Sequence, residues 1–185
     1  DAFRWDYLDR GVSPNLEKVR EDGFSAKALQ PCFPSKTFPN HLSIITGMYP
    51  ENHGIISNSF SDPENDEWYS INDLSSKCQS KWYKGEMFWE TAKKNGIKTA
   101  SYFWPGSDLE DTTRNPNYYH IYEHKKPYLD RVDGIVDWFK LPYAERPHFL
   151  TLYFDHTDTY GHRYGPHSKE ILYSIALLDS IYGVL

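Results

Sequence analysis

Hydrophobic residues recur at helical spacing in several parts of the chain. Ser13 as N-cap, Pro14 at the first helical position and Gly23 as the stop predict one helix. A turn that contains several prolines precedes a second predicted helix, and it places Thr37 at or just before the N-terminus of that helix. By the same spacing, the other predicted helices cover about 37–47, 86–95, 129–139 and 168–182.

Short β-rich segments alternate with these helices, at residues 24–29, 97–104 and 148–154. Strands that alternate with helices predict an α/β fold with a mainly parallel sheet and helices on both faces. The remaining segments are polar or irregular. They are a surface insertion at about 57–84, a long aromatic loop over 108–126 and a polar, histidine-rich loop directly after the strand ending at 154.

The composition indicates a folded protein whose partners are not duplex nucleic acids. The chain has 185 residues, of which 39% are hydrophobic and 17% aromatic, which is enough to build a core. Its net charge of −6 argues against binding through neutralised phosphates. No apolar run approaches the roughly 20 residues of a transmembrane helix. Packed-looking sequence at both ends leads us to expect a chain cut from a larger domain.

The two cysteines, Cys32 and Cys78, lie far apart and form no CxxC motif. This spacing excludes a zinc knuckle and does not establish an oxidising compartment. A disulfide and two free thiols are both compatible with the sequence.

Function in such sheets gathers beyond the carboxyl ends of the strands. Asp158 and His162 come after the strand that ends at residue 154, and Gly161 relieves the turn between them. One carboxylate and one imidazole four residues apart suit Zn²⁺. The spacing alone is common, so a solvated polar loop is the alternative interpretation.

Thr37 is the second candidate. Free N–H groups at a helix N-terminus favour a phosphate, and a metal could make the hydroxyl a nucleophile. An ordinary N-cap is the alternative. Asp1, at the end of a strand that would precede it, is a possible metal ligand whose local sequence carries no further signal.

Taken together, these segments resemble the nucleotide pyrophosphatase/phosphodiesterase family of the alkaline phosphatase superfamily. The matching stretches occur in family order across nearly the whole chain. They are residues 1–4 (DAFR), 33–41 (FPSKTFPNH), 46–58 (TGMYPENHGIISN), 85–86 (GE), 103–108 (FWPGSD), 141–147 (LPYAERP) and 158–166 (DTYGHRYGP).

The resemblance implies an alkaline-phosphatase-like core, of which residues 1–185 would be the N-terminal part of a single catalytic domain. It implies a phosphodiesterase that holds two Zn²⁺ ions in the complete domain. Thr37 would be the nucleophile, activated by a zinc that Asp1 also ligates, and would form a covalent phospho-threonine. Asp158 and His162 would hold the second zinc.

The resemblance also assigns the substrate contacts. Asn58 matches the family asparagine that binds the phosphate oxygens. Phe38 and Tyr122 would be walls on which a nucleoside base stacks, and stacking selects weakly among bases. The expected substrate is a small nucleotide or another phosphodiester. Family members act outside the cytoplasm, so an extracytoplasmic location, periplasmic or cell-surface, is implied, while protein partners stay open.

The chain departs from the family pattern after His162. The family completes its metal sites with an Asp-His pair and a later histidine, and His167 lies in the wrong context. The three remaining ligands are therefore expected beyond residue 185, and the fragment alone should be catalytically incomplete.

Two other activities compete with nucleotide hydrolysis. A choline- or lipid-type phosphodiesterase would use the same metals, and aromatic walls also suit a choline headgroup. A sulfatase is suggested by Cys32-Phe-Pro-Ser-Lys36, which echoes the signature C-x-P-x-R but lacks its arginine.

Overall fold

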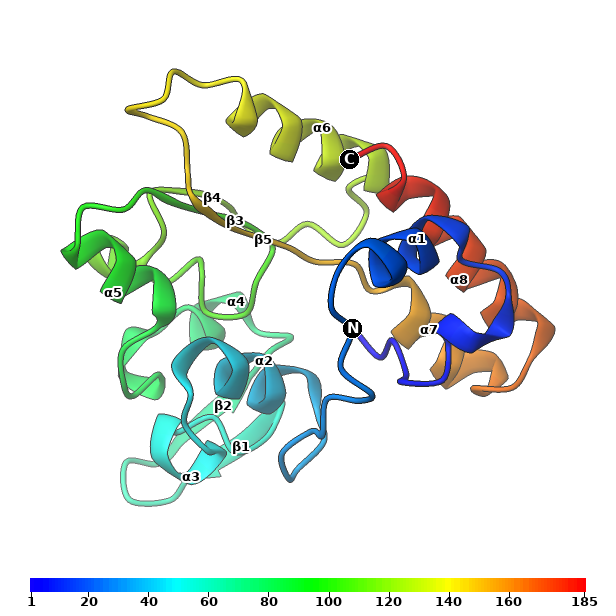
Figure 1. The fold of residues 1–185 in the computed structure, drawn as a ribbon. Coiled ribbons are helices and arrows are strands. Elements are labelled where there is room, and N and C mark those ends of the chain that lie inside the picture. The colour runs from blue at the N-terminus through cyan, green and yellow to red at the C-terminus, as the bar shows by residue number, and fades with distance from the viewer. The chain divides into compact units, whose positions relative to one another are not determined.

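Three short parallel strands form the main sheet, in the order β4–β3–β5 (Figure 1). The computed structural model describes residues 1–185 and assigns β3 to Thr99–Tyr102, β4 to Tyr118–His120 and β5 to Phe149–Leu152. Tyr102 pairs with His120 on one side and with Leu152 on the other. The two strands expected over 97–104 and 148–154 are confirmed. Strand β4 lies inside the segment expected to be an aromatic loop.

Helices cover both faces of this sheet, as the alternating pattern predicts. In the register of β3 and β5, Phe149 pairs with Thr99 and Leu152 pairs with Tyr102. Paired residues share a face of the sheet, and side chains alternate between faces along a strand. Thr99 and Tyr102 are three residues apart, so Phe149 and Tyr102 lie on opposite faces. Helix α5 (Phe88–Lys94) packs on one face, where the rings of Phe88 and Phe149 are 4.5 Å apart. The end of α6 (Tyr128–Phe139) packs on the other, with Trp138 5.8 Å from the Tyr102 ring.

The remaining elements are short helices and one antiparallel hairpin. The hairpin is formed by β1 (Ser59–Asp62) and β2 (Glu67–Ser70). The α-helices are α1 (Pro14–Asp22), α2 (Thr37–Thr46), α3 (Pro50–His53), α4 (Leu74–Lys77), α7 (His156–Tyr164) and α8 (Lys169–Tyr182). The 3-10 helices are η1 (Leu8–Arg10), η2 (Ser80–Trp82) and η3 (Thr112–Arg114).

Contacts divide the chain into two units, each made of several segments. The first unit contains residues 1–30, 125–137 and 153–185, and the second contains residues 31–124 and 138–152. The second unit has the larger core, built mainly of aromatic and aliphatic side chains from α2, α5 and the hairpin region. Its fully buried members include Leu42, Ile55, Tyr69, Met87 and Trp89. In the first unit, buried Tyr7 packs against Ile171 and Ile175 of α8.

Three further sequence expectations are corrected by the structure. Residues 24–29 form no strand, and Phe24 and Leu29 are 96% and 77% exposed, because no neighbouring strand pairs with them. The histidine-rich segment after β5 is helix α7 and not a loop. In the polar segment 57–84 the 62–67 turn is on the surface, but Tyr69 and Trp82 belong to the core.

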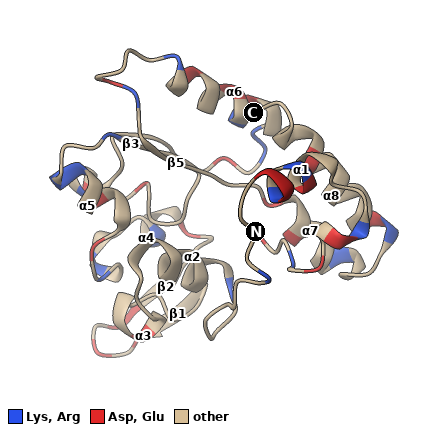
Figure 2. Cartoon of the chain, viewed as in Figure 1, with Lys and Arg blue, Asp and Glu red and all other residues tan.

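Charged side chains lie on the helices, the loops and the β1–β2 hairpin and are absent from β3 and β5, with acidic and basic residues interspersed (Figure 2). Every residue of β3 is buried, and an unpaired charge would be costly there. No helix is long and apolar enough to cross a bilayer.

Candidate active site

Thr37 is the first residue of α2, in the second unit. The N-cap position is held by Lys36, whose extended backbone (φ −115°, ψ 161°) turns into the helix without a side-chain cap. The interpretation of Thr37 as an ordinary N-cap is therefore wrong. Because its hydroxyl does not bond the helix end, Thr37 presents an uncommitted oxygen at the positive end of the helix dipole.

Asn58 supplies the missing cap from a distant position in the sequence. Its side-chain oxygen accepts a hydrogen bond of 3.0 Å from the backbone N–H of Phe38, the second residue of α2. Pro39, the third residue, has no N–H to satisfy. The bond also fixes the orientation of the amide, because only the oxygen can accept. The Asn58 NH₂ group is thereby left to donate to another acceptor.

Two buried histidines hold α2 in place. His41 Nδ1 donates to the carbonyl of Thr37 at 2.7 Å, and burial lowers the pKa of His41 to about 4. His53 Nδ1 accepts from the N–H of Ile55, so its Nε2 donates to Pro39 O at 3.1 Å. Burial also lowers the pKa of His53. Both imidazoles are therefore neutral near pH 7 and act as hydrogen-bond donors to the first turn of the helix.

The two aromatic residues assigned to base stacking have different surroundings. Phe38 is half-buried beside the core, with its ring 6.5 Å from Tyr69 in an edge-on arrangement. Tyr122 is 36% exposed, and its ring meets Phe103 edge-on at 5.3 Å. The Lys77 ammonium lies 5.7 Å from the Tyr122 ring centre. Each of the two rings therefore packs edge-on against one neighbouring aromatic ring.

Asp158 and His162 lie in the first unit, one turn apart on α7. The helix brings His162 Nε2 to 3.5 Å from Asp158 Oδ1, which is a consequence of the four-residue spacing. His162 is exposed, so its imidazole is open to solvent. The sequence predicted that Asp158 and His162 would lie in a loop, but in the structure they lie on one face of helix α7.

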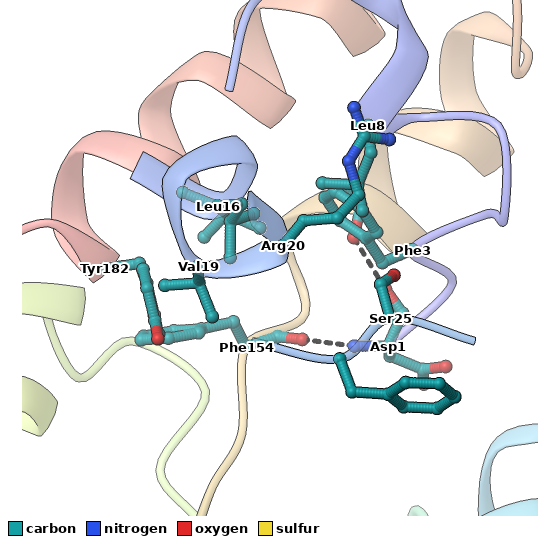
Figure 3. Close-up of a pocket in the computed structure, with 12 residues that line it drawn as sticks. Asp1, Phe3, Leu8, Leu16, Val19, Arg20, Ser25, Phe154 and Tyr182 are labelled. Carbon is teal, nitrogen blue, oxygen red and sulfur yellow. Dashed lines mark hydrogen bonds between the residues drawn. The ribbon is translucent and has the colours of Figure 1, made fainter. Parts of the chain in front are cut away.

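Asp1 lies beside these residues within the first unit. Its carboxylate accepts a hydrogen bond of 3.2 Å from the Tyr153 hydroxyl, and its carbonyl accepts one of 2.6 Å from Thr157. Its amino group donates to Phe154 O at 2.6 Å (Figure 3).

The donor types in the first unit suit zinc, but their number does not complete a site. Two carboxylates and one imidazole are typical zinc ligands. Nowhere in residues 1–185 do three or more histidine, cysteine, aspartate or glutamate side chains converge closely enough to hold a metal ion. Asp1, Asp158 and His162 are of the residue types that zinc takes as ligands, but they form no complete metal site within residues 1–185.

A cavity of about 420 Å³ lies next to Asp1 in the first unit (Figure 3). Its walls are mostly apolar side chains, including Leu16, Val19, Phe154 and Tyr182. All of its lining residues belong to the first unit.

The two cysteines are free thiols. Cys32 Sγ lies 3.3 Å from Ser43 Oγ of α2, and Cys78 is the C-cap of α4. Sequence reasoning did not single out His41, His53 or Tyr153. The first two lie inside the stretches that carry the family resemblance, which is the signal that could have found them.

The model of a protein family described as type I phosphodiesterase / nucleotide pyrophosphatase matches residues 1–185. The chain belongs to this family. Human ectonucleotide pyrophosphatase/phosphodiesterase family member 1 is 42% identical over 187 residues, which cover all of this chain and 20% of the relative. The venom phosphodiesterase of Macrovipera lebetinus is 38% identical over all of this chain and 22% of its own length. The chain thus spans about a fifth of these curated relatives.

Solved structures of the type I phosphodiesterase family have the same fold. Murine ectonucleotide pyrophosphatase/phosphodiesterase 5 superposes with a TM-score of 0.92 at 30% identity, over all of this chain and 49% of the relative. An inactive variant of that murine protein, with a threonine replaced by alanine, matches equally well and is in complex with AMP. The alkaline-phosphatase-like α/β assignment is thereby confirmed.

Proposed function

We propose that this chain provides the nucleophile half of a two-zinc enzyme that hydrolyses phosphodiester and pyrophosphate bonds in nucleotides. The observation that carries the proposal is the start of α2. There the hydroxyl of Thr37, the first residue, makes no capping bond, and the oxygen of Asn58 accepts from the adjacent Phe38 N–H at 3.0 Å. A hydroxyl, a helix dipole and a pre-oriented amide at one helix end suit attack on a phosphate.

Each residue has a defined part in this proposal. Thr37 Oγ1 attacks phosphorus, the bond to the leaving alcohol or phosphate breaks, and a phospho-threonine forms, which water then cleaves to regenerate the hydroxyl. Asn58 donates its NH₂ group to the phosphate oxygens as charge develops on them. Phe38 and Tyr122 hold the base. When bound, zinc lowers the pKa of the threonine hydroxyl and neutralises the phosphate charge.

Asp1, Asp158 and His162 are the residues of this chain that would hold the two zinc ions. Asp1 would serve the zinc at Thr37, and the other two would serve the second zinc. Three further ligands would come from sequence outside residues 1–185. The helical pairing of Asp158 with His162 at 3.5 Å supports their assignment to one ion.

The relatives support a nucleotide substrate and an extracytoplasmic location. Several are ectonucleotide pyrophosphatases, others are venom phosphodiesterases, and one solved relative is in complex with AMP. We extend both properties to this protein. That an inactive form of that relative carries a threonine-to-alanine change supports a threonine nucleophile.

The test uses the protein at its full natural length and a nucleoside-5′-monophosphate aryl ester. Thr37→Ala should lower kcat by at least about 10³-fold, because no other group can take the phosphoryl transfer. Thr91→Ala, which removes an exposed threonine hydroxyl on α5, is the matched control and should stay active. Undiminished turnover in Thr37→Ala would refute the mechanism.

A choline-type phosphodiesterase is the second candidate, because the exposed ring of Tyr122 could hold a quaternary ammonium against its face. Comparing the nucleotide ester with an aryl phosphorylcholine separates the two. A higher kcat/KM for the choline ester would assign the chain to that activity. An intact Cys32 thiol, seen by mass spectrometry in active protein, would remove the sulfatase alternative.

A further inference from the structure

The turn that leads into Thr37 is held together by one side chain. Residues 31–36 form no helix or strand. Asn40, one turn into α2, accepts a hydrogen bond of 2.9 Å from the N–H of Cys32. Its NH₂ group donates to the carbonyls of Pro34 at 3.0 Å and of Lys36 at 2.9 Å. Three alternate residues of the turn are thus bound by a single amide.

Only an amide satisfies all three partners. The turn offers the Cys32 N–H and the two close carbonyls of Pro34 and Lys36, with the Cys32 carbonyl further away at 3.5 Å, so the side chain must both accept and donate, which matches asparagine. Aspartate would accept from Cys32 but would set a negative oxygen against the carbonyls of Pro34 and Lys36. Alanine would leave the Cys32 N–H without its partner, and the carbonyls of Pro34 and Lys36 would keep only their backbone donors, the N–H groups of Lys36 and Asn40. The longer glutamine would not reach them in the same geometry.

The Lys36 carbonyl links this amide to the nucleophile. It accepts from both the Asn40 backbone N–H, at 3.2 Å, and the Asn40 side chain, at 2.9 Å. The same peptide group joins Lys36 to Thr37, so fixing its plane fixes the direction in which the chain enters Thr37. The opposite end of that residue is held by His41, which donates to Thr37 O.

We propose that Asn40 is a positioning residue for Thr37: it sets the orientation of the threonine hydroxyl by clamping the turn that precedes it. This inference rests on the proposed function, in which Thr37 is the nucleophile. A misplacement of the reacting atom by about 1 Å costs roughly 100-fold in rate. The clamp therefore acts on the chemical step and not on binding of the nucleoside.

The experiment compares Asn40→Asp, Asn40→Ala and wild type in the protein at full natural length. Asn95→Asp is the matched control, because Asn95 also donates its amide to a helix carbonyl, Thr91 O at 2.8 Å, at the exposed end of α5. Single-turnover release of the aryl group should slow roughly 10- to 100-fold in both Asn40 variants, with KM within about twofold of wild type. Asn95→Asp should match wild type.

A pH series gives a readout that a purely structural role would not move. In Asn40→Asp, protonation of the new carboxyl restores one donor toward the turn. The ratio of variant to wild-type rate should then rise as the pH falls, whereas the ratio for Asn40→Ala should stay flat. Urea midpoints measured alongside show whether the variants are folded.

The outcomes separate this inference from the function on which it rests. Wild-type rates in the Asn40 variants, together with an inactive Thr37→Ala, overturn the positioning role alone. Loss of folded protein in both Asn40 variants assigns Asn40 to stability and also overturns it. Full activity of Thr37→Ala refutes the proposed function first.

Discussion

The side-chain oxygen of Asn58 lies 3.0 Å from the backbone nitrogen of Phe38, so a residue from the segment before β1 caps the helix that begins with Thr37. The bond serves two purposes at once. It satisfies an N–H at the helix end, and it dictates which end of the amide faces away from the helix.

Because the oxygen of Asn58 caps the helix and its NH₂ group faces away from it, we predict that Asn58→Asp and Asn58→Ala will differ in stability more than in activity. Aspartate keeps the acceptor for Phe38 N–H but sets a negative oxygen where the NH₂ group stood. We expect its kcat to fall by about 10²- to 10³-fold with a near-normal urea midpoint. Alanine should show a similar kcat and a lower midpoint, by about 1 kcal/mol in unfolding free energy. Equal midpoints for the two variants would contradict the capping role.

Base stacking predicts a substrate-dependent loss. Phe38→Leu and Tyr122→Leu should each lower kcat/KM for a nucleoside-5′-monophosphate ester by about 10-fold, because stacking contributes about 1–3 kcal/mol. Neither should alter hydrolysis of an aryl methylphosphonate, which has no base. Tyr143→Leu, at a tyrosine that is 77% exposed, is the control. An equal loss on both substrates would show that the rings act on the helix and not on the base.

The helical pair on α7 predicts a metal deficit. His162→Ala should lower zinc content by about one ion per full-length protein, measured by atomic absorption, and reduce turnover with it. His167→Ala, five residues later, removes an imidazole outside the proposed ligand set and should leave both unchanged. A chelator should abolish wild-type activity and added zinc should restore it. Normal zinc content in His162→Ala would contradict the ligand assignment.

Burial of His41 predicts a pH-dependent stability. Its pKa in the folded chain is about 4, below the ordinary value of 6.5, so between these pH values only the unfolded chain takes up the proton. Stability is therefore lost as the pH falls from about 6.5 to about 4, by roughly 3 kcal/mol for this group.

His41→Leu should remove that part of the pH slope. Urea midpoints of variant and wild type, taken at intervals from pH 7.5 to 4.5, should converge or cross toward the acidic end. His148→Leu, at an exposed histidine, should run parallel to wild type. A parallel profile for His41→Leu would show that the histidine is not held neutral in the fold.

The sequence predicted helices well where the residues that start and stop a helix flank a segment with helical spacing of apolar residues. Ser13, Pro14 and Gly23 delimit α1, and the amphipathic run after Ser168 forms α8 with its cap in place. The prediction was wrong for residues 24–29, because β-rich composition forms a strand only when another strand pairs with it. Glycine at 161 suggested a loop, but the helix accommodates it, and an added Cβ there would meet only Ile171 at 3.9 Å.

In the candidate site, too, some residues could be located from local sequence signals and others could not. Thr37 could be located from the prolines before it, since they end irregular structure where the helix begins. The clamp by Asn40 and the cap by Asn58 could not, because both depend on turns whose path the sequence does not encode locally. The spacing of Asp158 and His162 was informative in either conformation, although the helix and not a loop produces their contact.

The segment boundaries of the two units fall between residues 30 and 31, 124 and 125, 137 and 138, and 152 and 153. Neither unit is therefore encoded by one uninterrupted stretch of gene. A chimera that exchanges only residues 31–124 with a relative would move Thr37 without Asp1, Asp158 and His162. An exchange that keeps either unit whole must therefore carry all of the segments of that unit.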